Sequence, residues 1–236
     1  MDRGDELAAR EVALGLEIEE HTLRFGADHH ETLVSMIALA ANHRERSDFE
    51  RARSIEAHVL ATLERDLVPG HPHILTVARN LAVTMSQLGE RAKSAELLER
   101  MIEAANEALG HGHAETIVTI EHLSSCLRAQ GRCEEALQQD ENACWLLTRT
   151  LGESDPRTIA SMQALANARW DTGNRSEARG LLGHAMVLLA RVHGGMTHPE
   201  VLPVIRVLAQ MHQQGGDLEF ASMLVELLKS VPLEEE

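Results

Sequence analysis

The chain of 236 residues has very few aromatic side chains and no run of basic residues. Aromatic residues make up 2 % of the chain and none of them is Tyr, so a core must be built from Leu, Ala, Met and Val. The formal net charge is −15 and the pI is about 5.4. Nucleic acids and anionic membranes are bound through clustered Lys and Arg, so this charge argues against both as partners.

Cysteine and long hydrophobic segments are also scarce. Cys126, Cys133 and Cys144 are odd in number and lack the C-x-x-C spacing, which predicts reduced thiols in a cytoplasmic protein. The first residues, Met1–Glu6, are acidic and lack the apolar segment of a signal peptide. No apolar run reaches the roughly 18 residues that a membrane span needs. We therefore expect a cytoplasmic protein that is not embedded in a membrane.

What the chain does contain is an internal repeat. His29, His71, His113, Asp155 and His198 recur at spacings of 42, 42, 42 and 43 residues. Four further positions agree across the five units: Leu39, Leu81, Leu123, Leu165 and Leu208; the small residues Ala40, Ala82, Ser124, Ala166 and Ala209; the turn residues Ser47, Gly89, Gly131, Gly173 and Gly216; and the small residues Ala52, Ser94, Ala136, Ala178 and Ala221. Small residues let two helices approach closely and Gly ends a helix, so each unit is predicted to be a helical hairpin in a stack.

These residues resemble a known family. The segments His71-Pro72, Asn80-Leu81-Ala82, Gly89 and Leu109-Gly110, with their counterparts in repeats three and four, resemble tetratricopeptide repeats of the 42-residue kinesin-light-chain type. The resemblance covers roughly residues 5–231. It implies an all-α, right-handed superhelical solenoid of antiparallel helix pairs that spans residues 1–236 as a single domain. It is specific for the fold and weak for function, because such repeats serve many partners.

The predicted units are an N-terminal helix over 5–24 and five repeats over 29–68, 71–110, 113–152, 155–195 and 198–231. The N-terminal helix ends at Phe25-Gly26, which matches Leu109-Gly110, so it stands at the place of a second helix without its first. This favours a piece of a longer protein over a simple cap. In repeat one, Ser47-Asp48 replaces the turn glycine and is expected to start the second helix by N-capping.

The resemblance also implies that the first helix of each repeat lines a concave groove. Arg44, Arg79, Arg128 and Arg206 outnumber the acidic residues at those positions, which would suit a carboxylate-bearing peptide because Arg pairs bidentately. Asn and Gln could hold a peptide backbone, and Trp170 is either an apolar anchor or a packing residue. The candidate partner-binding residues are Arg79, Asn80, Glu121, His122, Arg128, Gln163, Asn167, Trp170, Arg206 and Gln210. Trp145, on a second helix, is expected to pack between repeats.

The groove departs from the kinesin-light-chain pattern. The family carries an Asn directly before Leu-Ala, and only Asn80 keeps that place; Ala38, His122, Ala164 and Val207 replace the others. The scaffold is therefore expected to carry over, but a kinesin-type cargo site is not.

We expect no catalytic site, no metal site and no cofactor. The clustered histidines, such as His71 and His73, fall mostly at repeat anchors, which are too far apart to share one ion. His122 and Cys126 are four residues apart on one helix face and are the only candidate for an activated thiol. The predicted function is therefore a scaffold that binds a peptide or a partner segment in its groove. The alternatives are a sensor or regulatory segment of a larger signalling protein, an enzyme on a repeat scaffold, and self-association through the end helices.

Overall fold

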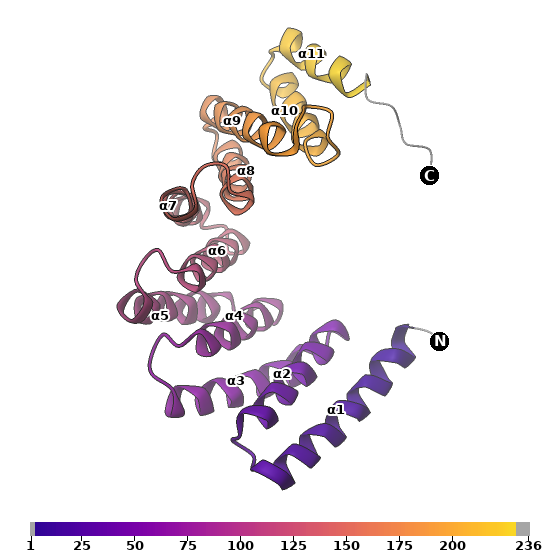
Figure 1. Cartoon of the computed structure of the whole chain (residues 1–236), viewed down its shortest axis with the longest axis vertical. Helices are drawn as coiled ribbons and strands as arrows, with labels where there is room; N and C mark the ends of the chain where they lie inside the picture. The colour runs from indigo at the N-terminus through magenta and orange to yellow at the C-terminus, as the bar shows by residue number, and fades with distance from the viewer. Residues whose placement is uncertain (1–2, 230–236) are drawn as a thin grey trace. The chain divides into compact units, whose positions relative to one another are not determined.

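The computed structural model describes residues 3–229, which divide into two compact units at Arg132 and Cys133. Unit 1 contains six helices (Figure 1): α1 (Arg3–Phe25), α2 (His30–Glu45), α3 (Phe49–Asp66), α4 (Pro72–Gln87), α5 (Arg91–Leu109) and α6 (Ala114–Ala129). Unit 2 contains α7 (Cys133–Leu151), α8 (Pro156–Asp171), α9 (Arg175–His193), α10 (Leu202–Gln214) and α11 (Leu218–Lys229). The predicted end of the last repeat, Val231, lies outside the described residues.

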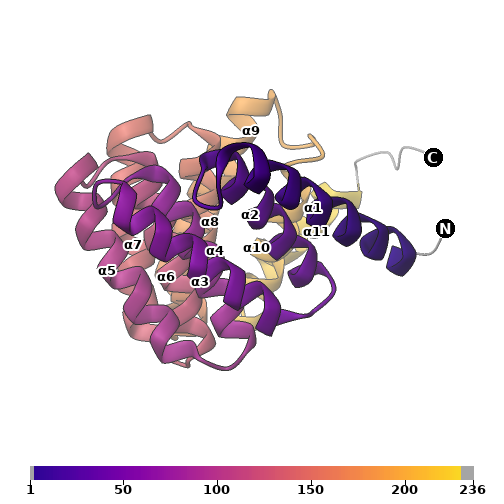
Figure 2. The ribbon, with the colours of Figure 1, turned by 90° about the horizontal axis from the view of Figure 1, so that it is seen from below.

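The prediction of an all-α repeat fold is confirmed, since residues 3–229 form eleven helices and no strand. In unit 1, α2 packs on α3 and α4 on α5; in unit 2, α8 packs on α9 and α10 on α11 (Figures 1 and 2). Each unit has an aliphatic core. In unit 1 it includes Val59, Leu60, Ile74, Leu75 and Met101, and in unit 2 it includes Ile159, Met162, Leu182, Ile205 and Leu208.

The small residues of the repeat lie where paired helices touch. Ala40 and Ala52 are both 0 % exposed, and so is Ser94, which faces Ala82. The Ser94 hydroxyl donates a hydrogen bond to the Ala82 carbonyl at 2.7 Å, so α4 and α5 approach to within hydrogen-bonding distance of the backbone. A larger side chain at either position would push the two helices apart.

The repeated His and Asp of the first four repeats are helix N-caps, whereas α10 of the fifth repeat begins after Val201 and not at His198. The Nδ1 atoms of His29, His71 and His113 accept hydrogen bonds from the backbone amides two residues later at 3.3, 3.2 and 3.2 Å. Asp155 does the same with a carboxylate oxygen at 2.8 Å. The bond satisfies one of the amide groups that every helix start leaves without a partner. The sequence placed these residues at the hairpin entrance but did not identify this role.

The turn without glycine behaves as predicted. Asp48 caps α3, its carboxylate accepting from the Arg51 amide at 3.4 Å. Ser47 takes a positive φ of 61°, the conformation that Gly89 adopts at φ 81° in the next repeat. The left-handed conformation ends the first helix, and Ser47 adopts it at a cost that Gly avoids.

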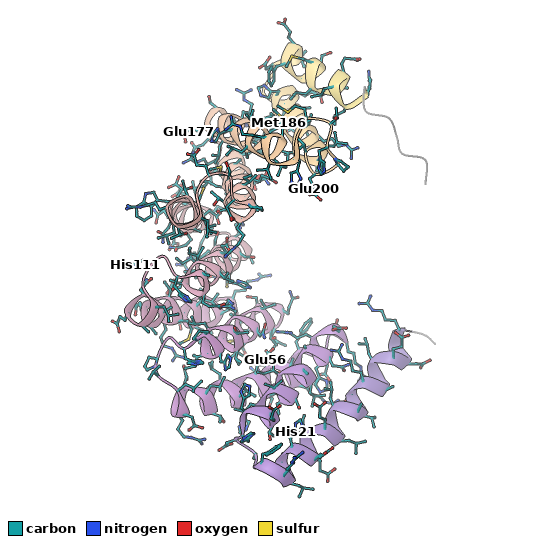
Figure 3. The ribbon with its side chains drawn as sticks, viewed as in Figure 1. His21, Glu56, His111, Glu177, Met186 and Glu200 are labelled. Carbon is teal, nitrogen blue, oxygen red and sulfur yellow. The ribbon has the colours of Figure 1, made fainter. Side chains whose placement is uncertain are left out.

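An ion pair with a buried carboxylate joins α2 to α3 in unit 1. Arg44 on α2 donates to Glu56 on α3 at 2.8 Å, and Glu56 is only 1 % exposed (labelled in Figure 3). Burial raises the pKa of Glu56, against the smaller opposing effects of the Thr84 hydroxyl and the Arg44 guanidinium. Arg44, which the sequence assigned to the groove, therefore joins the two helices of repeat one.

We predict that His71→Ala lowers the free energy of unfolding by about 1 kcal/mol, because the N-cap of α4 is lost. His71→Asp should retain the wild-type value, because Asp155 followed by Pro156 already caps α8 in this way. Urea unfolding followed by circular dichroism measures both variants. Equal destabilisation by Ala and Asp would show that the ring, and not the cap, matters.

The raised pKa of Glu56 predicts a pH dependence of stability. As the pH rises above the ordinary value of 4.5, the unfolded chain releases this proton before the folded chain does. The wild type should therefore lose stability relative to Glu56→Gln over the pH range that begins at about 4.5 and extends upwards, and the difference should be constant below that range. Urea unfolding of both proteins across the range tests this, since other titrating groups cancel in the difference. A difference independent of pH would contradict it.

Candidate peptide-binding groove

The exposed sides of α2, α4 and α6 form one surface of unit 1, here called the first-helix face. α4 contacts α6 directly. Val34 on α2 and Val83 on α4 are 45 % and 44 % exposed, although both are apolar. They mark two hollows in this face, one between α2 and α4 and one between α4 and α6.

The first hollow is apolar and holds about 110 Å³. Leu33, Val34, Ile37 and Val77 are among its lining residues. Two imidazole rings, those of His30 and His73, also line it, and they stack with their centroids 5.4 Å apart. A space of this size and character suits one aliphatic side chain with a polar group beside it.

The second hollow is more polar and holds about 170 Å³. It is lined by residues of α4, α5 and α6: Ala82, Val83, Ser86, Gln87, Ser94, Leu98, His122, Ser125, Cys126 and Ala129. The Ser86 hydroxyl donates to the Ser94 hydroxyl at 3.1 Å, and the Cys126 thiol donates to the same Ser94 oxygen at 3.1 Å. Ser94 thus joins the wall of the hollow to the contact between α4 and α5.

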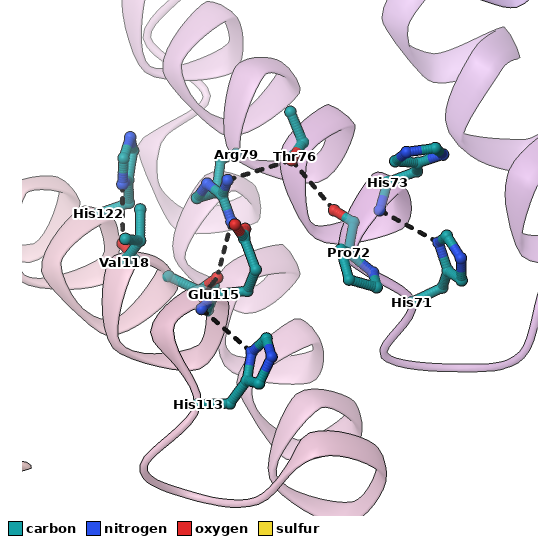
Figure 4. A network of polar contacts seen from close by, with 10 residues as sticks. His71, Pro72, His73, Thr76, Arg79, His113, Glu115, Val118 and His122 are labelled. Carbon is teal, nitrogen blue, oxygen red and sulfur yellow. Dashed lines mark hydrogen bonds and ion pairs between the residues drawn. The ribbon is translucent and has the colours of Figure 1, made fainter. Parts of the chain in front are cut away.

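Arg79 is engaged within the protein (Figure 4). Its guanidinium lies 2.8 Å from a Glu115 carboxylate oxygen and donates to the hydroxyls of Thr119 at 3.3 Å and Thr76 at 3.2 Å. The side chain is only 11 % exposed. Arg79 therefore ties α4 to α6, and a carboxylate from a ligand would compete with Glu115 for it.

His122 and Cys126 have separate partners. The His122 Nδ1 atom lies 2.8 Å from the Val118 carbonyl oxygen (Figure 4), and the Cys126 thiol is bonded to Ser94. Both side chains line the second hollow, but within residues 3–229 no hydrogen bond joins them. This arrangement does not activate the thiol in the way a Cys–His pair would require.

The remaining candidates divide between the two units. In unit 1, Asn80 and Glu121 are half-buried and Arg128 is exposed. In unit 2, Gln163 and Trp170 are half-buried, whereas Asn167, Arg206 and Gln210 are exposed. Arg79 and Asn80 are adjacent on α4, and His122 on α6 lines the second hollow together with Val83 on α4. The roles of these residues in binding stay predictions.

The two tryptophans differ from each other. Trp170 packs against the core of unit 2, and the Arg175 guanidinium lies 5.3 Å from the centre of its ring. Trp145, which was expected to pack between repeats, is 55 % exposed, and Arg149 lies 4.7 Å from its ring centre. That expectation is wrong: Trp145 lies on the outer side of α7, where its neighbour on the helix surface is a charged residue.

Among residues 3–229, no three His, Cys, Asp or Glu side chains are grouped as a metal ion would require. Within the same residues, no helix is both long and apolar enough to cross a membrane.

Sequence reasoning overlooked two of the lining residues. His30 and His73 were not predicted to face the groove, yet both line the first hollow. The sequence did contain a signal for the hollows. Val34 and Val83 are apolar residues at solvent-facing first-helix positions, and such a residue marks a hollow that neighbouring side chains surround.

Comparisons with known proteins agree with this architecture. Tetratricopeptide repeat models match residues 32–73, 73–144 and 158–200, together more than half of the chain. A solved structure from Podosopora anserina, described as a kinesin light chain with nearly identical TPR-like repeats, is 25 % identical with a TM-score of 0.74, over 84 % of this chain and 93 % of that one.

Two further solved structures are similar in fold. BtubC (BKLC) from P. vanneervenii is 17 % identical with a TM-score of 0.75, over 98 % of this chain and 95 % of that chain. YrrB, described as a TPR protein with an unusual peptide-binding site, is 11 % identical with a TM-score of 0.53, over 89 % of each chain. The repeat period, the paired helices and these matches agree: the chain belongs to the tetratricopeptide repeat family, and its repeats are of the kinesin-light-chain-like type.

Proposed function

We propose that this chain is an interaction scaffold that binds an extended segment of a partner protein along the first-helix face of unit 1. The tetratricopeptide fold in general serves protein–protein interaction, through extended surfaces formed by stacked repeats. The observation that carries the more specific proposal is the pair of hollows on one face, one apolar and one polar, with exposed Val34 and Val83 at their edges.

The spacing of the hollows suits an extended ligand. Thr76 lines the first hollow and Val83 lines the second, and both lie on α4. Seven residues of helix correspond to about 10 Å along α4, and the hollows also lie on opposite sides of that helix, so an extended peptide needs more than about three residues to reach from one to the other. One aliphatic side chain and one small polar side chain of an extended segment, separated by more than about three residues, would occupy the two hollows at once.

The charge of the ligand is a separate question. We propose a carboxylate-bearing ligand on the basis of the arginines at first-helix positions, but in unit 1 such a carboxylate competes with Glu115 for Arg79. Arg206 on α10 is exposed. The affinity for an acidic peptide should therefore depend less on Arg79 than its position in the sequence suggests.

The three alternatives to a scaffold differ in the observations that bear on them. Separate partners for His122 and Cys126 weaken the case for an enzyme. The regulatory segment of a larger protein remains a prediction. Self-association through the end helices also remains a prediction, and for α1 it would involve the outer side of that helix.

A selection from a random peptide library displayed on phage tests the proposal. Enriched peptides should bind the full chain and should lose at least about 10-fold in affinity for the variant Val34→Glu/Val83→Glu, because a charge would enter each hollow. Fluorescence anisotropy with labelled peptides measures the affinities. Both valines are already half exposed, so the variant should keep the helicity of the wild type.

The matched control is Val68→Glu/Val192→Glu, which adds the same two charges at exposed valines away from the first-helix face. This control should bind like the wild type. Peptides that lose affinity equally for both double variants would be responding to net charge, and peptides that bind all three proteins alike would place the binding surface elsewhere.

A further inference from the structure

The outer side of α1 is apolar and exposed. Val12, Leu16 and Leu23 are 66 %, 63 % and 85 % exposed, whereas Leu14 on the opposite side of the helix is buried. The three residues are spaced i, i+4 and i+11, so they form one stripe along the helix. α1 packs on α2 (Figure 1), and the buried Leu14 lies on the packed side. A row of large aliphatic side chains in water is the usual mark of an interaction surface.

Comparison within the repeat shows that these positions are not apolar in most second helices. Aligned by Phe25-Gly26 on Leu109-Gly110, the three positions correspond to side chains that are polar or absent in α3, α5, α7 and α9, and all of those residues are exposed. They are Ser54, His58 and Arg65 in α3; Glu96, Arg100 and Glu107 in α5; Gln138, Asn142 and Arg149 in α7; and Gly180, His184 and Arg191 in α9. These positions therefore face solvent in four repeats, and among the second helices of unit 1 only α1 makes them aliphatic. In α11 the first two positions are Met223, which is 55 % exposed, and Leu227, which packs against the core of unit 2.

The stripe is also not the surface against which a first helix packs. The second-helix positions that are buried in each repeat, such as Ala52 and Val59 in α3, correspond to Arg10 and Glu17 in α1. Arg10 pairs with Glu45 at 3.4 Å and Glu17 accepts from the Ser35 hydroxyl at 3.1 Å. The side of α1 that would receive a first helix is thus polar, and an incomplete hairpin does not explain the exposed stripe.

Acidic residues border the stripe. At 100° per residue, Glu19 and Glu20 lie on either side of the line through Val12, Leu16 and Leu23, and both are exposed. Within residues 3–229 neither carboxylate has an ion pair. The nearby Arg24 lies over the Phe25 ring at 4.8 Å. The surface therefore combines three aliphatic side chains with two uncompensated negative charges.

We propose that this stripe docks an amphipathic helix of a partner protein whose apolar side is flanked by Lys or Arg. The basic flanks would pair with Glu19 and Glu20. A helical ligand fits because a single helix offers a docked chain no backbone hydrogen bonds, and a helix satisfies its own. A second copy fits less well, because a two-fold pairing of α1 brings identical acidic borders towards each other. The proposal is independent of the first-helix face.

The probe is a labelled three-heptad helical peptide with Leu along one stripe, Lys on both flanks and Gln elsewhere. Fluorescence anisotropy with the full chain should show binding that weakens at least about 10-fold for Val12→Ser/Leu16→Ser/Leu23→Ser. Glu19→Gln/Glu20→Gln should also weaken binding and reduce its dependence on salt. The peptide with Glu in place of Lys should not bind.

The matched control is Glu96→Gln/Glu99→Gln, which removes two exposed carboxylates from the outer side of α5 and should leave the affinity unchanged. If both carboxylate pairs lower the affinity equally, or if the triple variant binds like the wild type, the peptide is attracted only by the acidic chain and the proposal fails. Failure of the wild type to bind the Lys peptide also overturns it.

Sedimentation velocity tests whether a second copy of the chain, and not a partner helix, covers the stripe. A wild-type dimer that Val12→Ser/Leu16→Ser/Leu23→Ser converts to a monomer would show that a second copy covers the stripe, which overturns the proposal. Circular dichroism checks that the triple variant is as helical as the wild type. Leu16→Lys, a single change at a side chain that is already exposed, repeats the binding test if the triple variant is less helical.

Discussion

Close contact between the two helices of a hairpin is the constraint on which the rest of this structure depends. It requires a small residue on each helix at the same level along the hairpin. Ala40 and Ala52 are such a pair, and neither has any exposed surface. In the second hairpin the contact is close enough for the Ser94 hydroxyl to reach the Ala82 carbonyl. Because a small side chain contributes little apolar area, cohesion comes from the aliphatic side chains around it, such as Leu75 and Met101. Among the described residues, the fully buried members of both core clusters include no aromatic side chain, which is consistent with such narrow spacing.

The same geometry determines which surfaces are left for partners. A first helix packs on its own second helix and on its neighbours, and its remaining side faces solvent. In unit 1 that side carries two hollows whose walls are built from the packing residues themselves: Ser94 belongs both to the helix contact and to the polar hollow. Arg79, in contrast, contributes its charge to the contact between α4 and α6. The first-helix face is therefore shaped mainly by packing, and its charges are largely committed within the protein.

Particular residues show which features of the structure could be predicted from the sequence. The period, the helix pairs and the turn at Ser47 could be predicted, because they depend on residues that recur or on bonds to near neighbours. The candidate site could be predicted only as a set of positions. Arg44 and Arg79 were correctly placed on first helices, but their partners, Glu56 and Glu115, lie 12 and 36 residues away. Trp145 was misjudged because its surroundings depend on which side of α7 faces solvent.

The sequence by itself therefore determined the repeat unit, the small residues at the helix contacts and the cap at Asp48, since each of these follows from local backbone chemistry. Only the tertiary structure decided which charged side chains are already paired, where hollows open between neighbouring helices, and that the aliphatic stripe of α1 points away from the hairpin contact. The physical reason is that these properties depend on distances between side chains on different helices. A repeat frame gives the height of a residue along its helix, but packing determines what that residue meets.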